Sequence, residues 1–453
     1  MNMILVPHDI DQRKANLWIA AIDTNSPPQN VSVLLMPGQR SIGLPRENWR
    51  SVTANEALKP ELRRVFIQTV PITNLQSNTT YEVSTKEGTK ARFSTLPTVL
   101  PQEDERPFTV LLSSCFYHGN DQEGRIGRAI KLLPENLKPS VKILCGDQVY
   151  LDLPATEDFE DDEAWLAENF LKKYSLTWGQ TDGYQTLLET GSTYFTADDH
   201  EFWNNFPNWA TLVNNTWDEE GRDRWKKVAL ALYEDFQSDD PSKAGHPRRF
   251  NIGVLSFFIA DTRVFREEGD RNFMSQADFE QLQQWIKGLK GPGVLVVGQP
   301  IFHEPEGWFS GRFGDRALSN YKQYKDLVHA IFQAEHSILV LTGDVHFGRV
   351  ASCELKSGPR PVELIEVISS PSSLVSSLVG GKAADAPPKF PPETIPGLVQ
   401  SVTKTIYKTA EDHFATLHFT ERAGRVRLQV RYWFHKNKNQ GAVDCRVLDP
   451  MDL

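Results

Sequence analysis

The chain lacks a long apolar segment, a cysteine framework and an excess of positive charge. None of its apolar runs approaches the roughly 18–20 residues that cross a bilayer, so we expect no membrane span. Its four cysteines (Cys115, Cys145, Cys353 and Cys445) show no C-x-x-C spacing, which argues against disulfides and leaves ligand roles open. The formal net charge of −10 disfavours tight binding to nucleic acid, so no stable nucleic-acid partner is expected.

The N-terminus carries no visible export signal. Residues 1–14 contain a four-residue apolar stretch followed by Asp9 and Asp11, without a twin-arginine pair. This pattern indicates a cytoplasmic protein by default, and a leader that was removed stays open as an alternative.

The length and patterning predict two domains, because 453 residues exceed one ordinary core. Residues 1–105 contain short alternating runs without helical periodicity, which predict an N-terminal β-sandwich. The residues around Tyr81 and Phe93 resemble the tyrosine corner and last strand of a fibronectin type III-like module. The expected strands lie at residues 16–20, 30–35, 64–70, 80–83 and 91–95.

Residues 106–453 show a different pattern, in which apolar strand-like runs alternate with helical stretches. This alternation predicts an α/β domain. The last two runs flank Arg422, Ala423 and Gly424 and predict an antiparallel hairpin. Residues 370–397 predict a long surface loop, which could cover a ligand site. Expected strands lie at 108–112, 141–145, 254–259, 294–297, 338–341, 364–367, 415–420 and 425–434, and expected helices at 127–133, 278–289 and 322–333.

Polar side chains follow most of the predicted strands of this second domain. Ligands of open α/β sheets bind outside the carboxyl ends of the strands, so we expect these side chains to meet at one edge. They are found in Ser-Ser-Cys at 113–115, Gly-Asp-Gln-Val-Tyr at 146–150, Asp-Asp-His-Glu at 198–201, Asp-Thr-Arg at 261–263 and Gly-Asp-Val-His at 343–346.

Each of these segments has an ordinary structural alternative. A lone Asp after a strand is more often a helix cap, and Asp-Asp-His-Glu could be a solvated acidic loop. The coincidence at strand after strand favours a site. Carboxylates that lie close together repel one another unless a cation binds between them, and thiol and phenol groups beside them indicate two unlike metals.

In these segments the chain resembles the PhoD-like alkaline phosphatases/phosphodiesterases, within the calcineurin-like metallophosphoesterases, from Phe108 to about Phe434. The resemblance implies a metallophosphatase-type α/β/β/α sandwich. It also implies hydrolysis of phosphate mono- or diesters by metal-activated hydroxide at a dinuclear site, in a family that is often exported. We expect a monomer that acts on small phosphate esters. A phosphatase-like binding or adhesion protein with little or no turnover is the alternative.

The resemblance also implies the metal ligands. Cys115, Tyr150 and His346 would bind the first metal, and Asp147 would bridge the two. Asp199 and Asp344 would serve the second metal. Fe³⁺ and Ca²⁺ are favoured, with Zn²⁺ or Mn²⁺ as alternatives. Structural alternatives stay open, because Tyr150 could pack on the sheet and Cys115 could be a small buried residue.

The resemblance assigns two catalytic roles. His200 would protonate the leaving oxygen, and Arg263 would hold phosphate oxygens with its planar guanidinium. Arg263 could instead pair with Glu267 or Asp261. The roles of four further polar residues stay open: His118, Asp152, Gln299 and His303.

Overall fold

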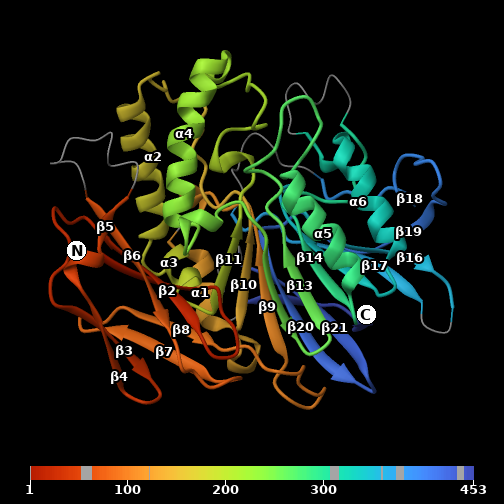
Figure 1. The fold of residues 1–453 in the computed structure, drawn as a ribbon, viewed down its shortest axis with the longest axis horizontal. Coiled ribbons are helices and arrows are strands. Elements are labelled where there is room, and N and C mark those ends of the chain that lie inside the picture. Colours follow the sequence, from red (N-terminus) through yellow and green to blue (C-terminus); the bar gives the residue numbers. More distant parts are fainter. Residues whose placement is uncertain are drawn as a thin grey trace.

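The computed structural model describes residues 2–52, 64–121, 123–306, 316–358, 361–373, 382–435 and 443–453. Within these ranges the chain forms two large mixed sheets and one small antiparallel sheet (Figure 1). The first large sheet has the order β22-β21-β20-β9-β10-β11-β1-β2-β6-β5, with β23 paired to β21. The second has the order β12-β13-β14-β15-β17-β16-β19-β18.

The first sheet combines strands from the two ends and the middle of the chain. Its strands are β1 (Asn2–His8), β2 (Ala15–Ile22), β5 (Arg50–Ser51), β6 (Val65–Ile72), β9 (Phe108–Ser113), β10 (Val141–Cys145), β11 (Ser192–Thr196), β20 (His413–Arg422), β21 (Arg425–Phe434), β22 (Asp444–Val447) and β23 (Met451–Asp452). In the middle of the sheet, β9, β10 and β11 are parallel, so their carboxyl ends reach the same edge.

The second sheet lies entirely in the C-terminal half of the described chain. Its strands are β12 (Arg248–Ile252), β13 (Leu255–Ile259), β14 (Gly293–Val296), β15 (Ile338–Thr342), β16 (Gly348–Lys356), β17 (Val362–Ile368), β18 (Lys389–Phe390) and β19 (Ser401–Thr409). Strands β13, β14, β15 and β17 are parallel neighbours.

Helices cover the outer faces of both large sheets, and α2 and α4 lie on one side of the view with α5 and α6 on the other (Figure 1). One apolar core lies between the sheets, a second between the first sheet and α1 to α4, and a third between the second sheet and α5 and α6. The helices are α1 (Arg125–Leu132), α2 (Glu163–Trp178), α3 (Tyr184–Leu188), α4 (Glu219–Phe236), α5 (Gln276–Gly288) and α6 (Lys322–Gln333). The predicted α/β class is confirmed, with the layers in the order α/β/β/α.

The N-terminal residues form two facing sheets, but one of them is part of the first large sheet. Strands β1, β2, β6 and β5 pair with one another, and β1 joins β11 in parallel through His8 and Thr193. The small sheet that faces them has the order β4-β3-β7-β8, built from β3 (Val31–Met36), β4 (Arg40–Leu44), β7 (Thr80–Thr85) and β8 (Lys90–Ser94).

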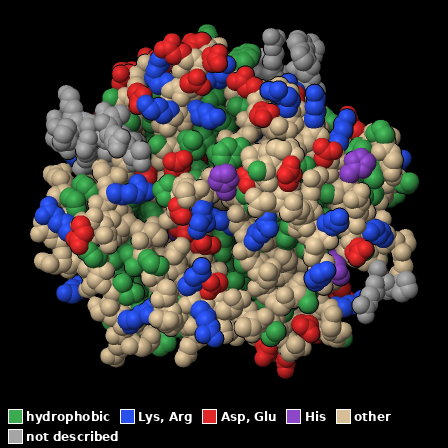
Figure 2. All heavy atoms as spheres, in the orientation of Figure 1, with side chains coloured by type: hydrophobic (Ala, Val, Ile, Leu, Met, Phe, Trp, Pro, Cys, Tyr) green, Lys and Arg blue, Asp and Glu red, His purple; other side chains and the backbone are tan. Residues whose placement is uncertain are grey.

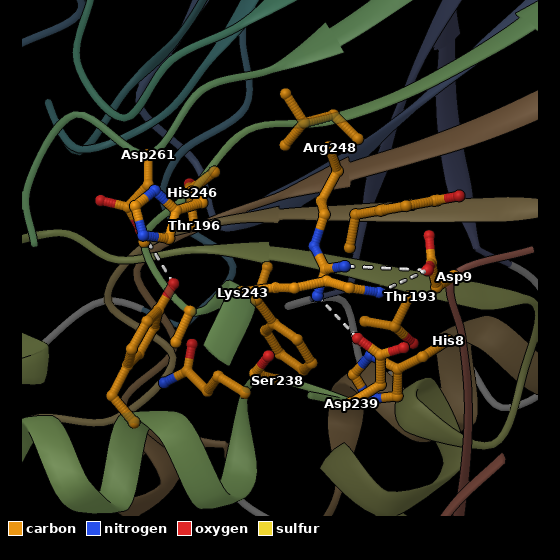
Figure 3. A pocket seen from close by; sticks show the side chains of 17 residues that line it. His8, Asp9, Thr193, Thr196, Ser238, Asp239, Lys243, His246, Arg248 and Asp261 are labelled. Carbon is orange, nitrogen blue, oxygen red and sulfur yellow. Dashed lines mark hydrogen bonds and ion pairs between the residues drawn. The ribbon is translucent and has the colours of Figure 1, made fainter. Parts of the chain in front are cut away.

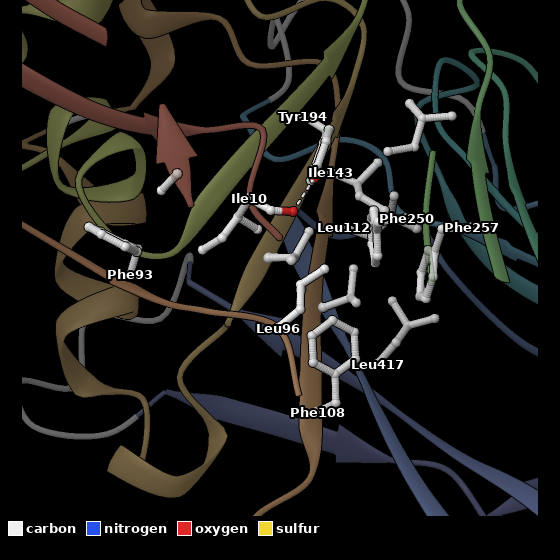
Figure 4. Packing of buried hydrophobic residues seen from close by; sticks show 14 of the residues in the cluster. Ile10, Phe93, Leu96, Phe108, Leu112, Ile143, Tyr194, Phe250, Phe257 and Leu417 are labelled. Atoms are coloured by element: carbon white, nitrogen blue, oxygen red, sulfur yellow. Dashed lines mark hydrogen bonds between the residues drawn. The ribbon is translucent and has the colours of Figure 1, made fainter. Parts of the chain in front are cut away.

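The hydrophobic core also crosses the predicted domain boundary. Figure 4 shows Leu96 in the same buried cluster as Leu112 and Phe257. The Trp18 indole of β2 donates a hydrogen bond of 2.8 Å to the carbonyl of Asp235 in α4. The division into residues 1–105 and 106–453 stays a prediction, and in this fold a continuous sheet and a shared core connect the two parts.

Most predicted elements of the second part lie where the patterns indicated. Strand β10 and helix α6 match their predicted residues, and the C-terminal hairpin is formed by β20 and β21. The sequence patterns missed the long helices α2 and α4, although their buried positions recur at the three- and four-residue spacing of a helix. The described cysteines are all free, as expected. No described helix is long and apolar enough to cross a membrane.

Candidate metal centre

The candidate site lies where strands of both large sheets end. Cys115 follows β9, Asp147 follows β10, and Asp199 and His200 follow β11 in the first sheet. Asp344 and His346 follow β15 in the second sheet. The parallel strands therefore bring residues that are far apart in the sequence to one edge, as the strand-end pattern predicted.

The backbone at the site adopts an uncommon conformation. Cys115, Asp147, Asp344 and His346 have φ angles of 54°, 54°, 67° and 55°. This left-handed region is costly for residues other than glycine, and such residues gather at functional sites. Four of the predicted ligands adopt this conformation, which is stronger evidence for a site than their residue types alone.

A glycine precedes each of the two aspartates for a steric reason. A Cβ atom on Gly146 would lie 2.3 Å from Cβ of Asp198, and one on Gly343 would lie 2.3 Å from Oγ of Ser114. Neither position has room for a side chain. The two Gly-Asp pairs therefore reflect the close approach of neighbouring strand ends.

The potential ligand atoms form two groups that share one residue. Cys115, Asp147 and His346 offer ligand atoms within 4.8 Å of one another, and so do Asp147, Asp199 and His200. Asp147 is present in both groups, which is the arrangement expected of a carboxylate that bridges two cations.

The Asp344 side chain lies beside these groups. Its Oδ2 accepts a hydrogen bond of 3.1 Å from the Gln299 amide, and its backbone carbonyl is 3.3 Å from Sγ of Cys115. Asp344 therefore faces the same centre, although its carboxylate is not a member of either group of described residues.

Tyr150 has the features of a ligand rather than of a simple packing residue. Its phenol oxygen is buried and has no hydrogen-bond partner among the described residues. Its ring lies 4.2 Å from the His200 ring, measured between centroids. A buried polar atom without a partner is costly, and a cation would satisfy it.

The electrostatics of the site also fit a cation. Burial raises the pKa of Asp147 and the neighbouring carboxylates add to this shift, although His200 lowers it; burial beside Asp147 and Asp344 raises the pKa of the Cys115 thiol. Burial lowers the pKa of His346 to about 4, which keeps its imidazole neutral and able to bind a metal. Bound cations would stabilise the carboxylate and thiolate forms. The donors present therefore fit two metal ions.

His200 is oriented by a carboxylate that the sequence left unassigned. Its Nδ1 lies 2.7 Å from Oδ1 of Asp152, whose other oxygen accepts the N–H of Asn204 at 2.8 Å. Burial alone would lower the pKa of His200, but Asp152, Asp199 and Asp147 together raise it. Asp152 thus positions the imidazole.

Glu201 is a structural residue whose role the sequence did not indicate. Its carboxylate accepts backbone N–H groups from Asp147 at 2.8 Å, Gln148 at 2.6 Å and Asp198 at 2.8 Å. Burial raises its pKa to about 7. By joining the ends of β10 and β11, Glu201 fixes the backbone that carries Asp147.

The Arg263 guanidinium contacts other protein groups. It is fully buried, forms an ion pair with Asp198, and donates a hydrogen bond of 2.8 Å to the Phe206 carbonyl. It is also not among the residues that line the cavity at the site. Its proposed contact with phosphate oxygens therefore stays a prediction. Its guanidinium pairs with Asp198, and Asp261 accepts the backbone N–H groups of Arg263 and Val264.

A cavity of about 670 Å³ opens at this centre. Asp147, Tyr150, Asp199, His200, Asp344 and His346 line it, and so do Asn204, Asn205, Gln299 and His303. Cys115 lies behind the cavity, fully buried. His118 lines a neighbouring cavity instead. The predicted loop at 370–397 begins at the site, since Ser370 Oγ is 3.1 Å from Sγ of Cys115, while its residues 374–381 lie outside the described ranges.

The fold and the strand-end ligands define an α/β sandwich with a candidate binuclear metal centre. The solved structure titled "Structure of PhoD" matches with a TM-score of 0.67 at 14% identity, over 98% of this chain and 88% of that one. The chain therefore has a PhoD-like fold, as the sequence segments predicted. A second solved structure, "GAP50 the anchor in the inner membrane complex of Plasmodium", matches with a TM-score of 0.38 at 13% identity, over 76% of this chain and 88% of that one, which is too weak to support an argument. No known protein family and no curated protein matches the sequence.

Proposed function

We propose that this chain is a metal-dependent hydrolase of phosphate esters whose active site surrounds Asp147. The observation that carries this proposal is that Asp147 lies within ligand-sharing distance of Cys115 and His346 in one group and of Asp199 in the other, in which His200 is assigned to proton transfer and not to the metal. When bound, two cations there would neutralise phosphate charge and lower the pKa of coordinated water. The PhoD-like fold supports the same reaction class.

The residues of the cavity supply the rest of the chemistry. In the hydrolysis, the water oxygen bonds to phosphorus and releases a proton to solvent, the P–O bond to the alcohol breaks, and the alcohol oxygen takes up a proton. His200 lines the cavity with its Nδ1 held by Asp152, so it is the proposed donor of that proton. Asn204 and Asn205 also line the cavity, and their amides could donate to phosphate oxygens.

The proposed metals are a ferric ion held by Cys115, Tyr150 and His346, and a calcium ion served by Asp199 and Asp344. Thiolate and phenolate suit a polarising metal, and carboxylates suit a hard ion. Elemental analysis and a visible spectrum test this assignment, because phenolate bound to ferric iron absorbs visible light. A colourless protein that contains only zinc would refute the iron assignment and leave the hydrolase proposal intact.

Turnover of p-nitrophenyl phosphate and bis(p-nitrophenyl) phosphate tests the hydrolase proposal. We expect activity that a chelator abolishes and that metal restores. No activity with iron, calcium, zinc or manganese would favour the alternative, a binding protein on a phosphatase-like scaffold.

We also propose that the N-terminal sandwich is fibronectin type III-like. Its two strand orders, β1-β2-β6 and β4-β3-β7-β8, support this assignment. So does the Tyr81 phenol oxygen, which accepts the Gln76 N–H at 2.8 Å in the manner of a tyrosine corner.

A further inference from the structure

The outer wall of the cavity is apolar, in contrast to its metal-binding floor. Leu153, Trp209, Leu212 and Val213 line it together with several other small or apolar residues. Trp209 is 42% exposed and Leu212 is 67% exposed. Large apolar side chains exposed at a cavity mouth commonly mark a binding surface.

Hydrogen bonds hold the loop that presents Trp209 and Leu212. The Trp217 indole donates to the Ala210 carbonyl at 3.0 Å, and the Trp203 indole donates to the Asn208 carbonyl at 2.6 Å. The Thr216 hydroxyl donates to the Val213 carbonyl at 2.7 Å and accepts the Ala210 N–H at 2.8 Å. These bonds fix the backbone that carries the two exposed apolar side chains, which lowers the entropic cost of ordering the loop when a ligand binds.

The charges around the cavity select against a strongly anionic substrate. No lysine or arginine is among the described residues that line it, whereas Asp152 and Glu306 add carboxylates to those of the predicted ligands. Cations at the floor could neutralise one phosphate group. Among the described residues, a second anionic group would face an apolar wall and Glu306, with no lysine or arginine in the lining.

We infer that the substrate is a phosphate ester that carries an uncharged apolar alkyl or aryl group, and that Trp209 and Leu212 bind this group. This inference rests on the proposed phosphoesterase function, because it places the phosphate at the floor of the same cavity. Apolar burial against the wall then adds to affinity in proportion to the size of the group.

Binding of alkylphosphonates tests the inference without requiring turnover. Methyl-, butyl- and octylphosphonate share one head group, and their dissociation constants can be measured by calorimetry below the micelle concentration with the metal-loaded protein. We expect octylphosphonate to bind at least about 10-fold more tightly than methylphosphonate. Leu212→Asn and Trp209→Gln should each reduce that ratio severalfold. The matched control is Leu132→Asn, since Leu132 is 45% exposed on α1, away from the cavity.

Equal affinity for all three phosphonates, or no binding, would overturn the inference. So would a chain-length dependence that both cavity variants leave unchanged. Parallel assays with the two nitrophenyl substrates separate this result from the proposed function. Turnover without any chain-length preference would refute the apolar binding site alone. Tighter binding of longer phosphonates without turnover would refute the hydrolase proposal alone.

Discussion

Two polar clusters of this fold stabilise buried carboxylates in opposite ways. Figure 3 shows the first, a cavity of about 30 Å³ where β1 meets β11, with Asp239 beside Arg248. Arg248 and Asp239 form an ion pair of 2.7 Å, and the Asn16 amide donates to Asp239 at 2.6 Å. Burial would raise the pKa of Asp239, but His8 and Arg248 lower it below its usual value.

At the candidate metal centre, Asp147 has other carboxylates as its close neighbours. The described residues lining its cavity include no lysine or arginine, and the pKa of Asp147 is raised by burial and by Asp199, Glu201 and Asp344. Charged side chains of both signs are interspersed on the outer surface instead (Figure 2). In the first cluster a protein cation offsets the buried carboxylate, whereas the described residues of the second fit the addition of cations.

The largest expected effect is the loss of turnover in Asp147→Asn. Replacing the shared carboxylate weakens both groups of ligands, so kcat/KM should fall by at least about 1000-fold. Steady-state assays with saturating metal measure this loss. Asp239→Asn is the matched control, and retained activity in Asp147→Asn would contradict the bridging role.

The next effect is a loss of stability, and we expect it only at the first cluster, where Asp239 pairs with Arg248. Asp239→Asn removes the nearer carboxylate of Arg248 and leaves it only Asp9 at 3.7 Å, which should lower the free energy of unfolding by roughly 1–3 kcal/mol. In metal-free protein, Asp147→Asn should instead raise it, because the amide removes a negative charge that burial and the neighbouring carboxylates disfavour. Denaturant unfolding measures both variants, and the same sign for both would refute the contrast.

Metal binding should stabilise the wild-type protein. A ligand that binds only the folded state adds about 2.7 kcal/mol at 100 times its dissociation constant. The melting temperature of chelator-treated protein should therefore rise with added metal, and the rise should be much smaller in Asp147→Asn. An equal rise in both proteins would locate the binding elsewhere.

The smallest effect is the pH dependence of stability that His8 gives to the first cluster. Burial lowers the pKa of His8 to about 4, although Asp239 opposes this shift. The unfolded chain takes up this proton near pH 6.5 and the folded chain only near pH 4, so stability falls as the pH drops through this window. At pH 5.5, His8 should lower the free energy of unfolding by roughly 1 kcal/mol relative to its value at neutral pH. Stability measured from pH 7 to 5 in His8→Gln should show a smaller slope, and an unchanged slope would exclude His8.

The sequence predicted the site better than it predicted the connection between the two parts of the chain. Asp147, Asp199, Asp344 and His346 could be selected because they follow apolar strands, and a strand end is visible in local patterning. The pairing of β1 with β11 could not be foreseen, because it joins residues that are nearly 200 positions apart through His8 and Thr193. The partner of Arg263 is a similar case, since Asp198 becomes its neighbour only when two loops meet.

The sequence by itself determined which residue types stand at the ends of the strands and therefore the kind of chemistry available there. Periodicity and residue type are local properties, and they are sufficient to predict strands and the groups that follow them. The tertiary structure decided that Asp147 belongs to two groups of ligands, that Arg263 is withdrawn from the cavity, and that Trp209 and Leu212 form its outer wall. These properties depend on distances between segments remote in the chain, which only the packing of the two sheets establishes.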